Sequence, residues 1–166
     1  RISMERLMDV RGIGQVKAVQ LKCVAELAAR MAKAKAAERL AFDTPETIAD
    51  YFMEDLRYAE QEQLHVLFLN TRNKLLKEKL MFQGTVNASL VSPREIFMEA
   101  LECRAVRMVL VHNHPSGDPA PSPEDVRMTH RIYKTGEMLG IQLLDHIIIG
   151  DHCYSSFQER GILSEE

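Results

Sequence analysis

The chain has 166 residues, 46% of them hydrophobic and 27% charged, with a formal net charge of −3 at pH 7. These values fit one folded core with a small appendage and exclude an intrinsically disordered protein, and no apolar run approaches the roughly 20 residues of a membrane-spanning helix. Three widely spaced cysteines without a Cys-x-x-Cys pair argue against a disulfide framework and a cysteine zinc knuckle, and without an apolar leader we expect a cytoplasmic protein with no membrane partner.

Residues 1–41 predict a helical hairpin. Gly12 and Gly14 separate a short apolar segment from a stretch, Gln15 to about Leu40, whose apolar residues recur at helical spacing, so one face of this long helix is expected to pack against another surface. The pattern resembles a truncated helix-hairpin-helix, in which backbone amides at the turn bind a DNA phosphate without reading the bases. Gly12, Gly14 and Lys17 would then contact nucleic acid. A glycine turn that is only architecture is the alternative.

Charge is distributed unevenly along the chain. Residues 1–39 contain nine basic and four acidic residues, a net +5, whereas residues 40–166 contain twelve and twenty, a net −8, and the two sum to −3. A basic first part is consistent with non-specific DNA contact, and a solvated helix face explains the same charge. We place the domain boundary near Phe42, which gives a helical hairpin fragment over residues 1–41 and a main domain over residues 42–166.

Beyond this boundary, helical and strand patterns alternate. Ser or Thr followed by Pro opens each expected helix, and short apolar runs mark each strand. In chain order we expect a helix from Pro45 to about Tyr58, a hairpin of strands Leu64 to Leu69 and Lys74 to Phe82, a loop or bulged strand from Gly84 to Leu90, a helix from Pro93 to about Cys103 opened by a capping box of Ser92 and Glu95, a strand from Arg107 to Val111, a helix from Pro123 to Leu139 and a strand from Gln142 to Gly150. This order predicts an α/β (mixed α+β) fold in which helices flank one mixed sheet.

A candidate metal site lies where the predicted strand Arg107 to Val111 ends. His112 and His114 follow it, and because strand side chains alternate between faces, the two imidazoles point the same way and are close enough to share a cation. Asp125, at the start of the next helix, either closes a capping box with Ser122 or turns inward as a third ligand. Two imidazoles and a carboxylate suit Zn²⁺ and leave a fourth position open for water, which indicates catalysis. A pair of satisfied polar histidines beside a loop is the alternative.

The same residues carry a family resemblance. His112, His114, Pro115, Ser122 and Asp125 match the JAMM motif of the MPN-domain zinc metalloproteases. The longer string V-H-N-H-P-S-G-D-P-x-P-S, together with G-T-V-N-A-S and L-L-D-H-I-I-I-G, resembles the bacterial RadC family more specifically. The resemblance implies an MPN fold from Phe42 to Glu166, one zinc ion per chain and hydrolysis of an amide or isopeptide bond in a peptide or protein substrate.

A zinc hydrolase of this type also needs a general base. In JAMM proteins this is a Glu at the start of an early strand, and Glu62 matches that placement, with Glu60 and Glu78 as competitors. Ser122 would cap the helix, assist the oxyanion of the reaction, or do both.

Other histidines have weaker claims. Asp145 and His146 are adjacent on a predicted strand and so point to opposite faces, which favours a structural or supporting role over a joint one in a single site. His65 alternates with apolar neighbours and is interpreted as structural, and His130 and His152 as surface residues.

Two functions remain open from the sequence. The first is a zinc-dependent metallopeptidase, indicated by the His-His-Asp set with an upstream Glu. The second is a non-enzymatic, DNA-associated protein with a structural or vestigial metal site, indicated by the basic hairpin and by the association of the RadC family with DNA repair. A structural site would have no need of a base beside an open metal position.

Overall fold

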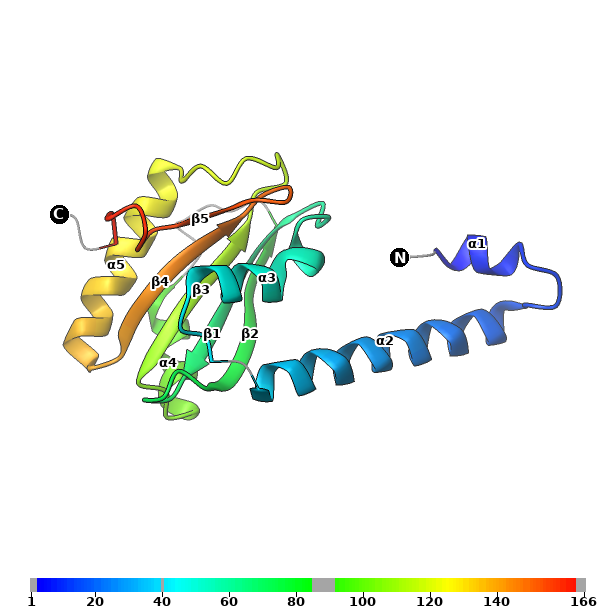
Figure 1. Cartoon of the computed structure of the whole chain (residues 1–166), viewed down its shortest axis with the longest axis horizontal. Coiled ribbons are helices and arrows are strands. Elements are labelled where there is room, and N and C mark those ends of the chain that lie inside the picture. The colour runs from blue at the N-terminus through cyan, green and yellow to red at the C-terminus, as the bar shows by residue number, and fades with distance from the viewer. Residues whose placement is uncertain (1–2, 40, 85–91, 164–166) are drawn as a thin grey trace. The chain divides into compact units, whose positions relative to one another are not determined.

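The computed structural model describes residues 3–39, 41–84 and 92–163, and the chain divides into two compact units, Arg1–Leu40 and Ala41–Glu166 (Figure 1). The segment 85–90, expected to form a loop or bulged strand, lies outside the described residues.

The first unit is a helical hairpin. Helix α1 (Met4–Met8) begins at Ser3, whose side chain accepts a hydrogen bond from Arg6 N, and helix α2 (Gln15–Arg39) follows the glycine turn. One face of α2 was expected to pack against another surface, but within this unit most of its described apolar side chains are exposed. Their exposed fractions are 46–71% for Val16, Val19, Leu21, Val24, Leu27 and Met31. Among the described helices, none is both long enough and apolar enough to span a bilayer.

The second unit is built on a mixed sheet, as the sequence predicts, and the sheet has five strands, one more than the four that were expected. Its strands are β1 (Glu62–Leu69), β2 (Leu75–Gly84), β3 (Arg107–Asn113), β4 (Gln142–Ile149) and β5 (Tyr154–Ser156). They lie in the order β2-β1-β3-β4-β5, in which β3 and β4 run parallel and every other neighbouring pair is antiparallel. The candidate metal site therefore lies at the central strand of the sheet.

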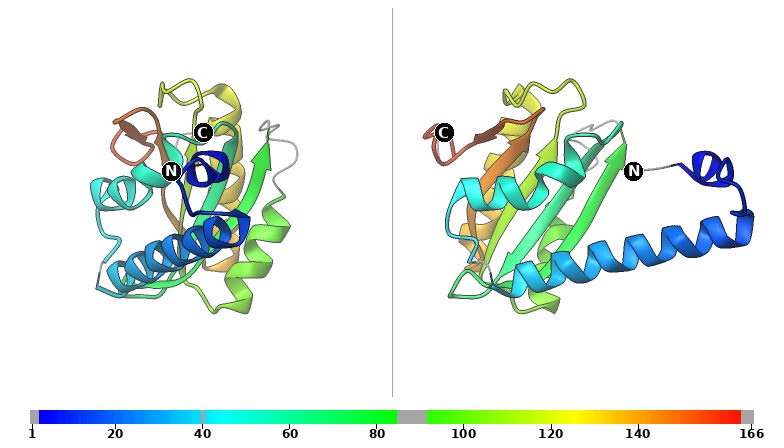
Figure 2. Two further views of the ribbon diagram at one scale, coloured as in Figure 1. Left: turned by 90° about the vertical axis from the view of Figure 1, so that its right-hand side faces the viewer. Right: turned by 45° about the vertical axis from the view of Figure 1, so that its right-hand side comes forward.

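Helices cover both faces of this sheet. Helix α3 (Pro45–Leu56) lies on one face, and helices α4 (Pro93–Glu102) and α5 (Pro123–Leu139) lie on the other (Figures 1 and 2). The alternation of side chains divides the core accordingly, because Val66 and Leu110 pack in one cluster with Ile96 of α4 and Ile132 of α5. His65 points the other way and lies against Phe52 of α3, with a ring-centroid distance of 5.2 Å.

The helix starts differ from one another in their capping. Thr44 caps α3 and Ser122 caps α5 through their side chains, as their sequences predict. The predicted capping box at Ser92 is wrong, because its side chain makes no capping bond and only its carbonyl accepts from Glu95 N and Ile96 N. The ψ angle is 119° at Ser92 and 161° at Ser122, which turns the first helical amides away from the Ser92 hydroxyl.

Candidate metal centre

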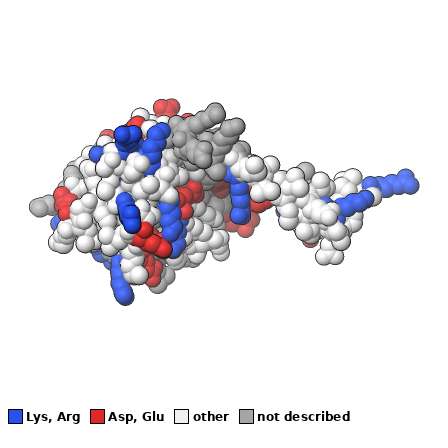
Figure 3. All heavy atoms as spheres, turned by 90° about the horizontal axis from the view of Figure 1, so that it is seen from below, with Lys and Arg blue, Asp and Glu red and all other residues white. Residues whose placement is uncertain are grey.

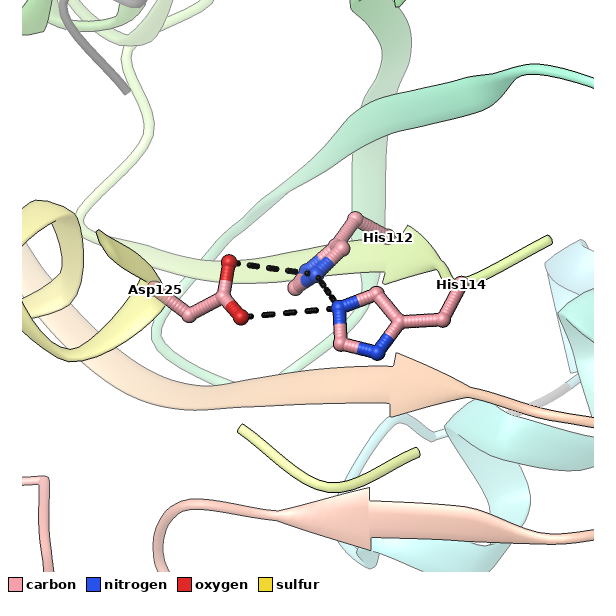
Figure 4. A group of neighbouring side chains, drawn as sticks. All are labelled: His112, His114 and Asp125. Atoms are coloured by element: carbon pink, nitrogen blue, oxygen red, sulfur yellow. Dashed lines mark hydrogen bonds and ion pairs between the residues drawn. The ribbon is translucent and has the colours of Figure 1, made fainter. Parts of the chain in front are cut away.

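Three side chains of the predicted set converge at the carboxyl end of β3. His112 Nε2 lies 3.0 Å from His114 Nε2 and 3.3 Å from Asp125 Oδ1, and His114 Nε2 lies 3.5 Å from Asp125 Oδ2 (Figure 4). One ligand atom from each residue lies within 4.8 Å of the others, so the group could hold a metal ion. His112 lies inside β3 rather than after it, because the strand continues two residues beyond the predicted end.

The first turn of α5 positions Asp125. Its Oδ2 accepts hydrogen bonds from Ser122 N at 2.7 Å and from Ser122 Oγ at 2.6 Å, while Asp125 N donates to Ser122 Oγ at 3.2 Å. The sequence left open whether Asp125 closes a capping box or faces the histidines. The structure combines both, because Oδ2 completes the cap and Oδ1 faces His112.

The loop after β3 holds His114. Its Nδ1 lies 2.8 Å from Asp118 O, and because a carbonyl only accepts, Nδ1 carries the proton and neutral His114 presents an unprotonated Nε2 to the centre. This loop is fixed in turn by the segment after β4, where Asp151 N donates to Gly117 O at 2.9 Å. A Cβ atom at Gly150 would lie 2.4 Å from Gly117 O, so this close approach requires glycine.

His146 reaches the centre from β4. Its Nε2 lies 2.7 Å from His112 Nδ1, and its ring stacks on Phe157. The neighbouring Asp145 points the other way, as predicted, and accepts from Ser156 Oγ at 2.5 Å and from Gln158 N at 2.9 Å. His146 thus supports a residue of the site, whereas Asp145 ties β4 to the chain around β5.

Burial and charge set the protonation of these groups. Burial lowers the pKa of His112 to about 4, so its imidazole is neutral at pH 7. When His114 is protonated, its Nε2 donates to Asp125, which raises the pKa of His114, and the nearby charge of Glu62 acts in the same direction. Burial alone would raise the pKa of Asp125, but His114, His112 and the Ser122 hydrogen bonds together hold it below its ordinary value. A carboxylate facing a neutral imidazole forms a site for a cation.

Glu62 lies on the same face of the sheet as the histidines. Leu64 is the register partner of His112, and Glu62 is two residues before it on β1, which places it on the same face and toward His114. Of its competitors, Glu78 lies on the α3 face, where it accepts from Tyr51 OH at 2.9 Å. Glu60 precedes β1 and is exposed. The geometry therefore favours Glu62 among the three.

Two residues at this site were not singled out by sequence reasoning. Asn113 brackets Glu62, which means that its side chain bonds to the backbone of the residue on either side. Its Oδ1 accepts from Gln63 N at 2.9 Å, and its Nδ2 donates to Gln61 O at 3.2 Å. Thr129 lies 2.6 Å from His146 Nδ1. The available signals were the place of Asn113 between the two histidines and the four-residue spacing from Asp125 to Thr129, which is one helical turn.

The predicted nucleic-acid contacts lie in the first unit, at its turn. Gly12 has a φ of 90°, and a Cβ atom at Gly12 or Gly14 would meet open space. Lys17 Nζ donates to Gly12 O at 3.0 Å. Among the described residues of the unit Ala41–Glu166, acidic and basic side chains are interspersed on the face seen in Figure 3.

Comparison with known proteins gives a consistent family. A family model described as a RadC-like JAB domain matches residues 42–162. UPF0758 proteins of Shouchella clausii and Bacillus velezensis are each 45% identical to this chain over 161 residues, which is 97% of this chain and 70% of each relative. A UPF0758 protein of Halalkalibacterium halodurans is 43% identical over 161 residues, 97% of this chain and 69% of its own length. These names state no activity.

Proposed function

This chain belongs to the RadC family, and from that premise we propose that it is a zinc-dependent metallopeptidase that hydrolyses amide or isopeptide bonds. The observation that carries the proposal is the convergence of His112, His114 and Asp125 beside Glu62 on one face of the sheet. Peptides or proteins would be the substrates.

The donor set fits zinc better than a hard cation. Two imidazole nitrogens and one carboxylate oxygen are ligands of a borderline metal, whereas Mg²⁺ and Ca²⁺ prefer oxygen alone. His112, His114 and Asp125 would hold one zinc ion per chain, and three protein ligands are typical of catalytic rather than structural zinc sites. Bound zinc would supply Lewis acidity, which lowers the pKa of water toward neutrality and polarises a carbonyl.

Glu62 would act as the general base. It takes a proton from the attacking water and returns it to the leaving nitrogen, which lets the C–N bond break without expelling an amide anion. The side chain of Asn113 supports this role, because it fixes the backbone on both sides of Glu62.

Ser122 would orient Asp125 and assist the oxyanion. The first role is supported by the two hydrogen bonds that Ser122 donates to the carboxylate. The second requires the hydroxyl to turn from Asp125 Oδ2 toward the substrate, because a hydroxyl has a single proton.

A panel of unstructured peptides and isopeptide-linked conjugates tests the proposed activity. Zinc-loaded wild-type protein should cleave at least one of them, and Glu62→Gln should retain the metal but lose activity by on the order of a hundredfold or more. Glu60→Gln is the matched control and should behave as wild type. Equal rates for wild type and Glu62→Gln would exclude Glu62 as the base, and no cleavage across the panel would count against the peptidase.

A second proposal concerns the unit Arg1–Leu40. The open glycine turn and the net +5 of residues 1–39 support non-specific contact with DNA phosphates through Gly12, Gly14 and Lys17. This proposal is independent of the metal centre, whose residues all lie in the other unit.

A further inference from the structure

A hydrogen-bonded chain of three buried side chains runs behind the candidate metal centre. Thr129 Oγ1 lies 2.6 Å from His146 Nδ1, and His146 Nε2 lies 2.7 Å from His112 Nδ1. Thr129 and His146 are fully buried and His112 is 2% exposed, so water does not reorganise this chain. The same Thr129 hydroxyl lies 2.6 Å from Asp125 O, one helical turn earlier on α5.

The Thr129 hydroxyl has one proton, and the geometry fixes where it lies. A carbonyl oxygen can only accept, and two oxygens 2.6 Å apart repel unless a proton lies between them. Thr129 therefore donates to Asp125 O. Its oxygen can then only accept from the other side, so Nδ1 of His146 carries a proton and donates to Thr129.

The direction of the first hydrogen bond determines the rest of the chain. His146 is fully buried and its side-chain partners are a hydroxyl and a second imidazole, neither of which carries a negative charge, so the ring is neutral and its only proton is on Nδ1. Nε2 of His146 has no proton and therefore accepts a hydrogen bond from Nδ1 of His112, which carries one. In neutral His112 the remaining nitrogen, Nε2, has no proton, and this is the atom that faces His114 and Asp125.

We propose that Thr129 is a positioning residue, which sets the direction of the chain Thr129–His146–His112 and so keeps Nε2 of His112 unprotonated and directed at the metal position. The position of each proton along this chain, which we call the proton order, follows from burial and the hydrogen bonds. The purpose of that order, which is to favour zinc binding at His112, rests on the proposed zinc site. In the reversed chain, Nε2 of His112 would carry a proton that a metal must first displace. The loop carbonyl of Asp118 fixes His114 in the same sense from the opposite side.

The helix that carries Asp125 thus also sets the proton position of His112. Asp125 offers its carboxylate to the centre, and its backbone carbonyl, one turn from Thr129, fixes the Thr129 hydroxyl. The packing of α5 against the sheet therefore affects two of the three candidate ligands, Asp125 and His112.

Nitrogen-15 NMR of the histidine side chains in the metal-free, full chain tests the proton order directly. We expect protonated Nδ1 and unprotonated Nε2 in both His112 and His146. A proton on Nε2 of neutral His112 would overturn the inference, whatever the protein's activity. Because this measurement needs neither zinc nor substrate, its failure is distinguishable from failure of the proposed function.

Zinc affinity of Thr129 variants, measured by competition with a chelator, tests the purpose. Thr129→Val removes the hydroxyl at constant volume and should weaken zinc binding about tenfold to a hundredfold, the range found for partners of metal ligands. Thr135→Val is the matched control, because Thr135 on the same helix donates to Arg131 O at 2.7 Å in the same way, and it should bind as wild type. Thr129→Ser keeps the hydroxyl and should restore the affinity.

Unchanged zinc affinity in folded Thr129→Val would overturn the claim that Thr129 supports zinc binding, and it would leave the proposed metallopeptidase function intact. If Thr129→Val does not fold, the wild-type NMR spectrum and the affinity of Thr129→Ser decide, and a Thr129→Ser protein as weak as a His112→Ala variant would also contradict the inference.

Discussion

Asn113 brackets Glu62 at the point where β1 and β3 separate. Its side-chain amide accepts from Gln63 N and donates to Gln61 O, in the place where a strand backbone would otherwise continue the ladder. Glu62 is thereby held on the face that carries His112 and His114.

Replacing Asn113 should separate catalysis from metal binding. Asn113→Leu should keep zinc but lower kcat on the order of tenfold or more, because a general base must lie within hydrogen-bond reach of its proton. Asn70→Ala is the control, since Asn70 Oδ1 accepts from Arg72 N and Lys74 N at the other end of β1 and should affect only stability. Steady-state kinetics on a cleaved peptide and zinc analysis measure both effects, and an unchanged kcat in Asn113→Leu would show that the bracket is not needed.

Ser122→Ala should affect both folding and metal binding. Loss of the cap should lower the free energy of unfolding by about 1 kcal/mol, and loss of the Oγ donor should weaken zinc binding because Asp125 is no longer oriented. Thr44→Ala removes the cap of α3, which contains none of the candidate ligands, and should lower stability without changing zinc affinity. Denaturant unfolding and chelator competition provide the comparison, and equal zinc affinities in both variants would argue against a positioning role for Ser122.

Zinc binding should depend on pH through His114. Its pKa is raised because the protonated ring donates to Asp125, so a proton competes with the metal for Nε2 and the affinity should fall as the pH falls through this raised pKa. His112, with a pKa of about 4, is already neutral and releases no proton near pH 7. Binding should therefore release at most about one proton per zinc at about pH 6, below the pKa of roughly 7 of a zinc-bound water. Calorimetry in two buffers of different ionisation enthalpy measures this number, and release of two protons would contradict the assignment.

Asp145 should limit stability at high pH. Burial raises its pKa in the folded protein above the unfolded value, although three hydrogen bonds to its oxygens oppose the shift. The protonated form is thus favoured by folding, so its contribution is present below the unfolded pKa and is lost as the pH rises through the folded pKa. Relative to Asp145→Asn, which stays neutral, the wild type should lose stability as the pH rises through this raised carboxyl pKa. Parallel pH dependences of the two unfolding free energies would contradict this.

Removing residues 1–40 should separate the two proposals. Binding to duplex DNA at low salt should weaken and zinc content should not change, because the candidate DNA contacts and the candidate metal ligands lie in different units. The DNA affinity of the full chain should also fall steeply with added salt, since phosphate contacts release counterions. Unchanged DNA affinity in the truncated protein would exclude the hairpin.

Periodicity and capping predicted most of the fold, because these signals are local. Helix α5 spans Pro123–Leu139, as predicted from its start at Ser122, and the two-residue alternation placed His112 and His114 on one face. The true start of β1 at Glu62 was missed, since the pairing of Glu62 with Gly84 and the Asn113 bracket depend on residues far away in the sequence.

The contacts behind the site also escaped prediction, for the same reason. Thr129 and His146 meet only when α5 packs on β4, and a single sequence contains no register between a helix and a strand. His130 was expected at the surface but is half-buried, with its Nε2 3.1 Å from Ile162 O. His152 is exposed, as expected.

Native metal analysis of the purified full chain tests the central claim most directly. We predict about one zinc ion per wild-type chain and nearly none in the His112→Ala, His114→Ala double variant, because that variant leaves a single carboxylate of the converging group. A folded wild-type protein that takes up no zinc, or a double variant that retains one zinc ion per chain, would contradict the claim.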